Sequence, residues 1–238
     1  MLNYNKLIVN PRAKSPIIEA YKTLRTNLQF SGLDKRLKVI MITSARASEG
    51  KSTTACNLAV TMAQNGKKVL LVDADLRKPA VHRAFGLLNE KGLTNILAEG
   101  LKFRDICNEA GIPSLEVITG GPIPPNPAEL LGCPRMEGFI DAASDAYDII
   151  ILDAPPVLPV TDAAVLSRLT DGVIFVVEHG KTPSDQAVVA KEALVKVGAR
   201  IIGAVINNVP AKASGNYGYN YYYYDEDGIR KKKSERHV

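Results

Sequence analysis

The chain has 238 residues, of which 46% are hydrophobic and 23% are charged, as is usual for a globular protein with one large domain or two small ones. No apolar run approaches the roughly 18 to 20 residues of a membrane-spanning helix, and the first residues lack the apolar core of a secretory signal, so we expect a cytoplasmic protein. The net charge of +5 is concentrated at the ends, which can contact acidic protein surfaces or anionic membrane faces.

The apolar pattern predicts strands that alternate with helices. Helical spacing covers 16–30, and further helices are expected from Lys51 to about residue 65 and from about residue 183 to 197. The apolar runs typical of buried strands are KVIMIT (38–43), GKKVLLVD (66–73), LEVIT (115–119), DIIILD (148–153), GVIFVVE (172–178) and RIIGAVIN (200–207). This alternation predicts a doubly wound, mostly parallel α/β sheet with helices on both faces, which binds ligands beyond the carboxyl ends of its strands.

Two less regular regions complete the domain. A mixed stretch with short helices is expected up to about residue 113. The loop GGPIPPNPAELL (120–131) should lead into a helix, with Asn126 as N-cap, Pro127 at the first helical position and Glu129 at the third. The apolar pattern stops after residue 210, so we predict one domain over 1–210 and a flexible tail over 211–238.

The segment ARASEGKST (45–53) carries the strongest chemical signal. It follows a predicted strand and opens a predicted helix, which is the context of a phosphate-binding loop. Main-chain N–H groups at the helix start attract phosphates, Lys51 adds a positive charge, and the Ser52 hydroxyl is a suitable Mg²⁺ ligand. The expected nucleotide-binding residues are Ser48, Glu49, Gly50, Lys51, Ser52 and Thr53.

Two other predicted strands end in carboxylates. Asp73 and Asp75 follow the strand 66–73, and Asp153 closes the strand 148–153. An apolar strand that ends in aspartate is typical of a group that holds Mg²⁺ directly or through water beside a bound nucleotide. The structural alternative is a turn or cap aspartate, which is common after strands.

The tail contains an unusual cluster of tyrosines. Six of the nine tyrosines fall within eight consecutive positions of a polar, glycine-bearing segment that cannot build a core: Tyr217, Tyr219, Tyr221, Tyr222, Tyr223 and Tyr224. Either this segment is low-complexity sequence or its hydroxyl groups are substrates.

Together these features resemble the bacterial tyrosine kinases, P-loop proteins unrelated in fold to eukaryotic protein kinases. The resemblance rests on the phosphate-binding loop, on VLLVDADLR (69–77) and IIILDAPP (149–156), and on EAYKTLRTN (19–27) and PPNPAELL (124–131). The tyrosine-rich C-terminus is also a feature of that family, where it is the autophosphorylation site. The short form resembles the cytoplasmic kinase of capsule and exopolysaccharide systems, in which the membrane-spanning adaptor is a separate protein.

The resemblance implies particular roles at the matching positions. Lys51 and Ser52 would bind phosphates and Mg²⁺, and Asp73 would be the base that accepts the tyrosine proton. Asp73, Asp75 and Asp153 would all help to hold the Mg²⁺ ion. Asn207, after the last strand, would face the adenine of ATP.

The resemblance also implies partners. Glu19 and Arg25 match the first and last positions of a family oligomerisation motif within residues 1–37, which implies a homo-oligomeric ring. Its middle arginine is Lys22 here, and lysine cannot form the same two-bond fork. The remaining implied partners are a transmembrane adaptor that activates the kinase at the membrane, tyrosine-containing protein substrates and a cognate tyrosine phosphatase.

Two other functions are compatible with parts of the sequence. A partition or cell-division ATPase of the same fold would carry a second lysine at the position of Arg46, but has no use for a tyrosine cluster. A tail that binds nucleic acid by stacking and charge is compatible with YYYY (221–224) and RKKK (230–233), but the acidic DED (225–227) argues against it. We therefore expect no nucleic-acid partner.

Overall fold

A computed structural model describes residue 7 and residues 15–31 and 37–210; the tyrosine cluster and the rest of the tail lie outside the described residues. The described residues up to Asn207 form one compact unit, which ends at the boundary between Asn207 and Asn208. The domain boundary expected after residue 210 stays a prediction. No helix within the described ranges is both long enough and apolar enough to cross a bilayer.

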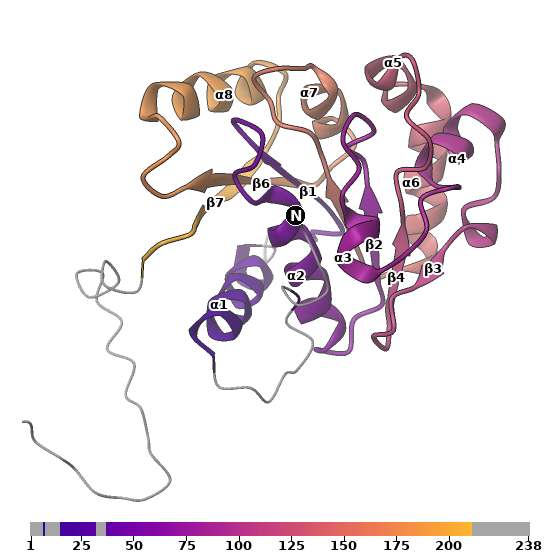
Figure 1. The fold of residues 1–238 in the computed structure, drawn as a ribbon, viewed down its shortest axis with the longest axis horizontal. Helices are drawn as coiled ribbons and strands as arrows, with labels where there is room; N and C mark the ends of the chain where they lie inside the picture. The colour runs from indigo at the N-terminus through magenta and orange to yellow at the C-terminus, as the bar shows by residue number, and fades with distance from the viewer. Residues whose placement is uncertain (1–6, 8–14, 32–36, 211–238) are drawn as a thin grey trace, which may run out of the picture. The chain divides into compact units, whose positions relative to one another are not determined.

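A seven-stranded sheet forms the centre of the fold (Figure 1). Its spatial order is β3-β4-β2-β5-β1-β6-β7, and every neighbouring pair is parallel except β3 with β4. The strands are β1 Val39–Ser44, β2 Val69–Asp73, β3 Asn108–Glu109, β4 Leu115–Ile118, β5 Ile149–Asp153, β6 Gly172–Glu178 and β7 Ile201–Asn207. The predicted doubly wound α/β fold is confirmed.

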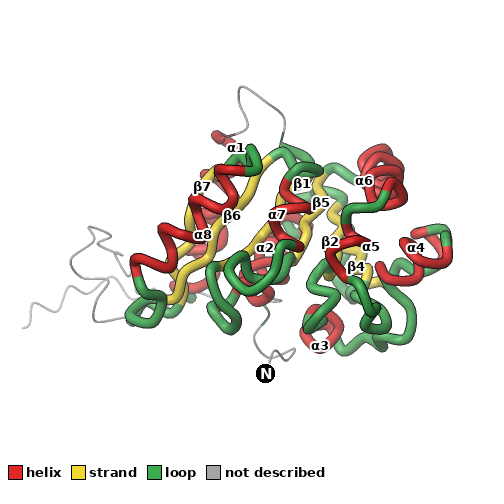
Figure 2. The backbone as a smooth tube through the Cα atoms, turned by 90° about the horizontal axis from the view of Figure 1, so that it is seen from above, coloured by secondary structure: helices red, strands yellow, loops and turns green. Residues whose placement is uncertain are grey.

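Helices cover both faces of this sheet, as the view from above also shows (Figure 2). The helices α1 Pro16–Ser31, α2 Lys51–Ala63 and α3 Val81–Phe85 contribute to the core on one face. The opposite core contains side chains of α4 Leu93–Glu99, α5 Pro127–Leu131, α6 Pro134–Ala146, α7 Asp162–Ser167 and α8 Ser184–Lys196. A short 3₁₀ turn, η2 Phe103–Asp105, precedes β3.

Successive residues of the central strands point alternately to the two cores. In β1, Met41 belongs to the core with α6 and α8, whereas Ile40 and Ile42 belong to the core with α2. Both faces are therefore buried, which explains why these strands read as uninterrupted Val/Ile/Leu runs rather than as alternating patterns.

The helix expected after the loop is confirmed as the five-residue α5, with Asn126 at the N-cap position and Pro127 at the first helical position. The next helix, α6, was not predicted; it starts separately at Pro134, since proline favours a helix start over a helix interior. Asn126 occupies the N-cap position without a side-chain bond to the main chain, and its Nδ2 instead donates to Glu129 Oε2 at 2.6 Å. The two-residue β3 was too short to carry a sequence signal.

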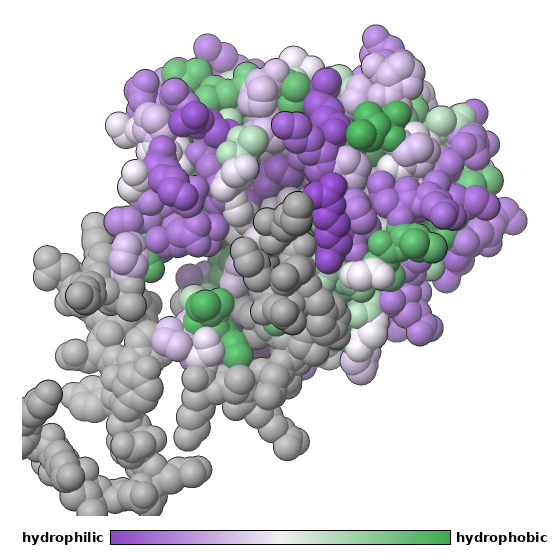
Figure 3. All heavy atoms as spheres, viewed as in Figure 1, coloured by the Kyte–Doolittle hydropathy of each residue, from purple (hydrophilic) through white to green (hydrophobic). Residues whose placement is uncertain are grey.

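Hydrophilic residues cover most of the face seen in Figure 3, where hydrophobic residues occur in small separate groups. This distribution fits a domain whose large apolar side chains are used in the two cores on either side of the sheet.

Gly92 and Gly138 should respond in opposite ways to replacement by alanine. A Cβ at Gly92, before α4, would clash with the main chain of Thr119 and Gly121, whereas one at Gly138, inside α6, would meet nothing within 4 Å. We expect Gly92→Ala to lower the free energy of unfolding by about 1 to 3 kcal/mol. Gly138→Ala should raise it by roughly 0.5 to 1 kcal/mol, because alanine has the higher helix propensity.

Urea unfolding of the two variants beside the wild type measures both effects. Equal unfolding free energies for Gly92→Ala and Gly138→Ala would contradict the close main-chain approach at Gly92.

Candidate functional site

The candidate site begins at the loop between β1 and α2. This loop turns on two residues with left-handed backbone conformation, Ser48 with φ 69° and Gly50 with φ 93°. A side chain at Gly50 would collide with the amide of Asn207 as well as strain the backbone, so glycine is required there. The turn directs the first residues of α2, Lys51, Ser52 and Thr53, to the carboxyl end of the sheet, where anions are favoured by the helix start.

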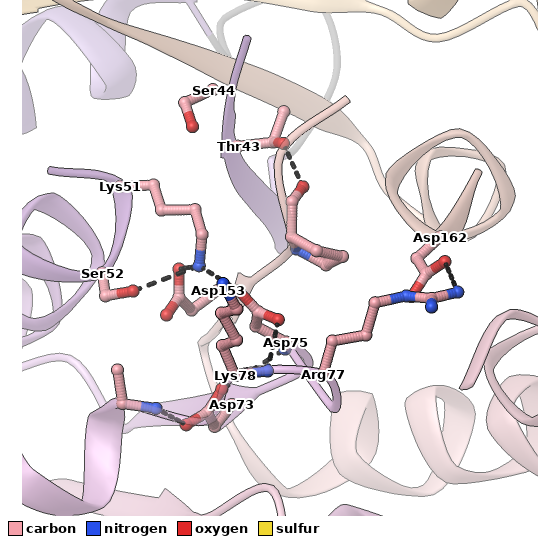
Figure 4. A network of polar contacts seen from close by, with 12 residues as sticks. Thr43, Ser44, Lys51, Ser52, Asp73, Asp75, Arg77, Lys78, Asp153 and Asp162 are labelled. Atoms are coloured by element: carbon pink, nitrogen blue, oxygen red, sulfur yellow. Dashed lines mark hydrogen bonds and ion pairs between the residues drawn. The ribbon is translucent and has the colours of Figure 1, made fainter. Parts of the chain in front are cut away.

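Lys51 lies between two carboxylates (Figure 4). Its Nζ is 2.7 Å from Asp75 Oδ2 and 3.3 Å from Asp153 Oδ1, and it donates to Ser52 Oγ at 3.2 Å. All four residues are buried. Burial alone lowers the pKa of Lys51, but the charges of Asp153 and Asp75 outweigh it and raise that pKa above its usual value. The ammonium group therefore stays charged.

Asp73 is adjacent to Asp153 because β2 and β5 are parallel neighbours with these two residues in register. It is completely buried, and its Oδ2 accepts main-chain N–H groups of Ala80 at 2.8 Å and Val81 at 2.9 Å. Burial, and then the negative charge of Asp153, raise the pKa of Asp73 to about 7. Of the three aspartates, Asp73 thus combines a strongly raised pKa with main-chain hydrogen bonds that fix its position.

The donor set fits a magnesium ion. Three buried carboxylates, Asp73, Asp75 and Asp153, face the single ammonium group of Lys51, so the site has more negative than positive charge. Asp153 Oδ2 is buried and has no hydrogen-bond partner in the described part of the chain, and burial raises the pKa of this carboxyl. Oxygen ligands and a surplus of negative charge are what Mg²⁺ requires.

Among the described residues, no group of three or more His, Cys, Asp or Glu side chains is arranged to hold a metal ion by itself. Mg²⁺ is usually held by one or two carboxylates together with substrate phosphates and water.

Contacts from two other loops hold the phosphate-binding loop in place. Glu49 Oε1 accepts the hydroxyl of Thr182 at 2.6 Å, its Oε2 accepts the Arg46 N–H at 2.9 Å, and its main-chain oxygen accepts Asn207 Nδ2 at 3.1 Å. Thr182 follows β6 and Asn207 ends β7. The structure therefore brings Asn207 to the loop, while its contact with adenine stays a prediction.

A bidentate ion pair closes the opposite side of the site (Figure 4). Arg77 Nε and Nη2 donate to Asp162 Oδ2 and Oδ1 at 2.9 Å and 3.0 Å. Arg77 lies two residues after Asp75, and Asp162 is a fully buried residue at the start of α7. The pair thus joins the loop after β2 to the segment that follows β5.

The predicted oligomerisation residues lie on α1, whose buried side chains are Ile18 and Leu28. Lys22 Nζ pairs with Glu19 Oε1 at 2.7 Å within the helix, and Arg25 Nη1 lies 3.4 Å from the main-chain oxygen of Thr61 on α2. The Nε of Arg25 is buried without a hydrogen-bond partner among the residues that the structure describes. The guanidinium group of Arg25 thus makes a contact within the chain, whereas the side chains of Glu19 and Lys22 remain partly accessible to solvent.

Sequence reasoning missed Arg77, Asp162 and Thr182. Arg77 stands inside VLLVDADLR and could have been examined as part of that motif. Asp162 and Thr182 carry no local signal, because their role depends on contacts across 85 and 133 residues of chain.

Comparison with known proteins agrees with this geometry. The AAA domain family model matches residues 37–185. The chain is 47% identical to the tyrosine-protein kinase YwqD of Bacillus subtilis over 90% of both chains. The solved kinase domain of the Escherichia coli tyrosine kinase ETK superposes with a TM-score of 0.84 at 37% identity, covering 93% of this chain and 86% of that one.

A weaker likeness shows the fold alone. The septum site-determining protein MinD of Pyrococcus horikoshii, solved with Mg-ADP, is 22% identical with a TM-score of 0.62 and covers 74% of this chain. The nucleotide-binding fold is therefore shared with a cell-division protein, but the greater similarity in sequence is to tyrosine kinases.

The raised pKa of Asp73 predicts how stability depends on pH when EDTA has removed divalent metal. The folded protein holds this proton more tightly, with a pKa of about 7 against the ordinary 3.8, than the unfolded chain does. This contribution to the unfolding free energy, up to about 4 kcal/mol, is present below about pH 4 and is lost as the pH rises through about 7.

Urea unfolding of wild type and Asp73→Asn at about pH 5 and about pH 8 measures this contribution. The stability advantage of the wild type over the variant should shrink at the higher pH. Asp141→Asn, at an exposed position on α6, is the matched control. A difference between wild type and Asp73→Asn that is independent of pH would contradict the assignment.

Proposed function

The chain belongs to the bacterial tyrosine kinases, and on this basis we propose that it transfers the γ-phosphoryl group of ATP to the tyrosines of its own C-terminal cluster. We further propose that this reaction regulates the synthesis and export of a capsule or exopolysaccharide. The observation that carries the proposal is the buried contact of Lys51 with Asp75 and Asp153 beside a phosphate-binding loop, in a chain that also contains six clustered tyrosines.

Each residue of the proposed site supplies one part of phosphoryl transfer. The loop from Ser48 to Thr53 binds phosphates through its main-chain N–H groups, and Lys51 neutralises phosphate charge. Ser52, Asp75 and Asp153 would hold Mg²⁺, and Asp73 would support them from its position next to Asp153. When bound, Mg²⁺ stabilises negative charge on the phosphoryl oxygens. Asn207, beside the loop, would contact the adenine.

Asp73 is the proposed base for the tyrosine hydroxyl. A carboxylate has about four acceptor positions, and Asp73 uses three of them for the main-chain N–H groups of Asp75, Ala80 and Val81. One position is left for a tyrosine O–H. The pKa of Asp73, about 7, is closer to the tyrosine pKa near 10 than the pKa of an ordinary aspartate is. Asp73 can therefore accept the proton late in a loose transition state.

Transfer between subunits is the proposed route to the tail. Tyr217 lies six positions after Ala211, and such a segment spans at most about 20 Å when extended. A neighbouring subunit offers a second site for the same tyrosines. The partly exposed side chains of Glu19 and Lys22 on α1 would contribute to the ring that brings the subunits together.

The proposed partners follow from membership of the family. A transmembrane adaptor would recruit the kinase to the inner face of the membrane and complete its nucleotide site. Other tyrosine-containing proteins would be further substrates, and a tyrosine phosphatase would reverse the modification. The proposal therefore includes weak activity of the isolated chain and stronger activity with a cytoplasmic fragment of the adaptor.

A mixing experiment tests transfer between subunits. One partner is Lys51→Met, which keeps its tyrosines but lacks the ammonium group of the site; the other has all six clustered tyrosines replaced by phenylalanine. Incubated together with Mg²⁺ and ATP, they should give phosphotyrosine on the tail of Lys51→Met, measured by mass spectrometry. Each variant alone is the control and should leave its tail unmodified.

A mixture that stays unmodified, while the wild type alone modifies its tail, would show that each chain phosphorylates only itself. An unmodified wild type, even with an adaptor fragment present, would overturn the proposed autophosphorylation.

Phosphorylation should also dissociate the oligomer. Each phosphotyrosine adds about −1.5 to −2 charges, so six add on the order of −10 to a tail whose net charge is +2. Light scattering coupled to size exclusion should show a smaller particle after incubation with ATP than before. The six-phenylalanine variant is the control, since its size should not change. An unchanged particle mass with fully modified tyrosines would contradict the repulsion mechanism.

A further inference from the structure

We propose that Asp162 is a positioning residue for phosphoryl transfer, which acts through Arg77 to hold the Asp75 carboxylate at the phosphate-binding lysine. This inference rests on the proposed roles of Lys51 and Asp75 in the kinase reaction. It concerns an ion pair that joins two loops of the site without itself touching Lys51.

Asp162 is a rigid anchor. It is completely buried, it stands at the first position of α7, and that helix is fixed in the core by Ala163 and Leu166. Both carboxylate oxygens accept a guanidinium N–H, at 2.9 Å and 3.0 Å. A two-bond fork fixes both the distance and the orientation of Arg77, which a single lysine contact could not do.

Arg77 connects the fixed side chain of Asp162 to Asp75 through a short loop. The loop residue Asp75 accepts the main-chain N–H of Lys78 on Oδ1 at 3.0 Å and contacts Lys51 through Oδ2 at 2.7 Å. Arg77 lies between these two loop residues in the sequence. Moving Arg77 away from Asp162 would therefore shift the hydrogen bond that orients the Asp75 carboxylate.

The contacts form a closed circuit around the site (Figure 4). Lys51 joins Asp75 to Asp153, β5 continues from Asp153 to the segment before α7, and the Arg77–Asp162 pair joins that segment back to the loop of Asp75. Without the ion pair, the Asp75 carboxylate keeps its contacts with Lys51 and Lys78, but its loop is no longer tied to the start of α7. The phosphate-binding loop is held separately by Thr182 and Asn207, so it should keep its geometry.

The consequence is a separation of catalytic rate from nucleotide binding. Loss of the ion pair should lower kcat about 10- to 100-fold, the usual effect of removing a group that orients residues around a metal. The KM for ATP should change little, because the main-chain groups that bind phosphates are not attached to Arg77. A purely structural role would instead change the amount of folded protein and leave the kcat of the folded fraction unaltered.

The test uses the full chain with Asp162→Asn, Arg77→Met and the double variant. Asp162→Asn preserves side-chain shape, and the double variant avoids leaving one charge unpaired in case a single variant folds poorly. Steady-state rates with Mg²⁺, ATP and a peptide of residues 216–227 are measured at a temperature where unfolding curves show every variant folded. The double variant should be no slower than the slower single variant, because both changes break the same contact.

Arg135→Met is the matched control. Arg135 is also a surface arginine with two hydrogen bonds, to the main-chain oxygens of Leu97 and Ala98 at 2.9 Å and 2.8 Å, but it lies on α6 and has no contact with the loops of the site. Its kcat should equal that of the wild type.

The outcomes separate this inference from the proposed function. A wild type that stays inactive even with an adaptor fragment present would overturn both. An active wild type with unchanged kcat in Asp162→Asn and Arg77→Met, or with losses that multiply in the double variant, would overturn the positioning role alone.

Discussion

The contact of Lys51 with Asp75 and Asp153 is the interaction on which the rest of the site depends. Taking three charged groups out of water costs several kcal/mol for each ion, and the attraction among them only roughly offsets that cost. Such a cluster is a poor way to stabilise a fold. It is a good way to hold a positive and a negative group at fixed positions where phosphate and a divalent cation meet, so its value lies in the chemistry.

The parallel sheet makes this cluster possible. β1, β5 and β2 are neighbours that run in the same direction, so the loop after β1, the end of β5 and the end of β2 reach one edge of the sheet together. Asp73 and Asp153 are paired in register, which explains why the negative charge of Asp153 adds to burial in raising the pKa of the Asp73 carboxyl. The remaining loops then determine the function that a shared fold supports, as the likeness in fold to a cell-division protein illustrates.

Much of this arrangement could be predicted from the sequence because its signals are local. Strand composition indicated the parallel sheet, and the segments around Lys51, Asp73 and Asp153 each carry a recognisable pattern at a strand end. The Arg77–Asp162 and Glu49–Thr182 contacts could not be predicted, since they join loops far apart in the chain and depend on how α7 and α8 pack. The start of α5 could also be predicted, because Asn126 followed by Pro127 is a local signal for a helix start.

The measurement that tests the account most directly is phosphotyrosine formation by the wild type and by Lys51→Met, each with Mg²⁺ and ATP and with folding verified. The account predicts phosphotyrosine in the wild type and none in the variant, because no other ammonium group contacts the paired carboxylates within the described residues. Equal phosphotyrosine in both proteins would contradict it. So would release of ADP by the wild type while every tyrosine stays unmodified, since the site would then hydrolyse ATP without transferring phosphate to protein.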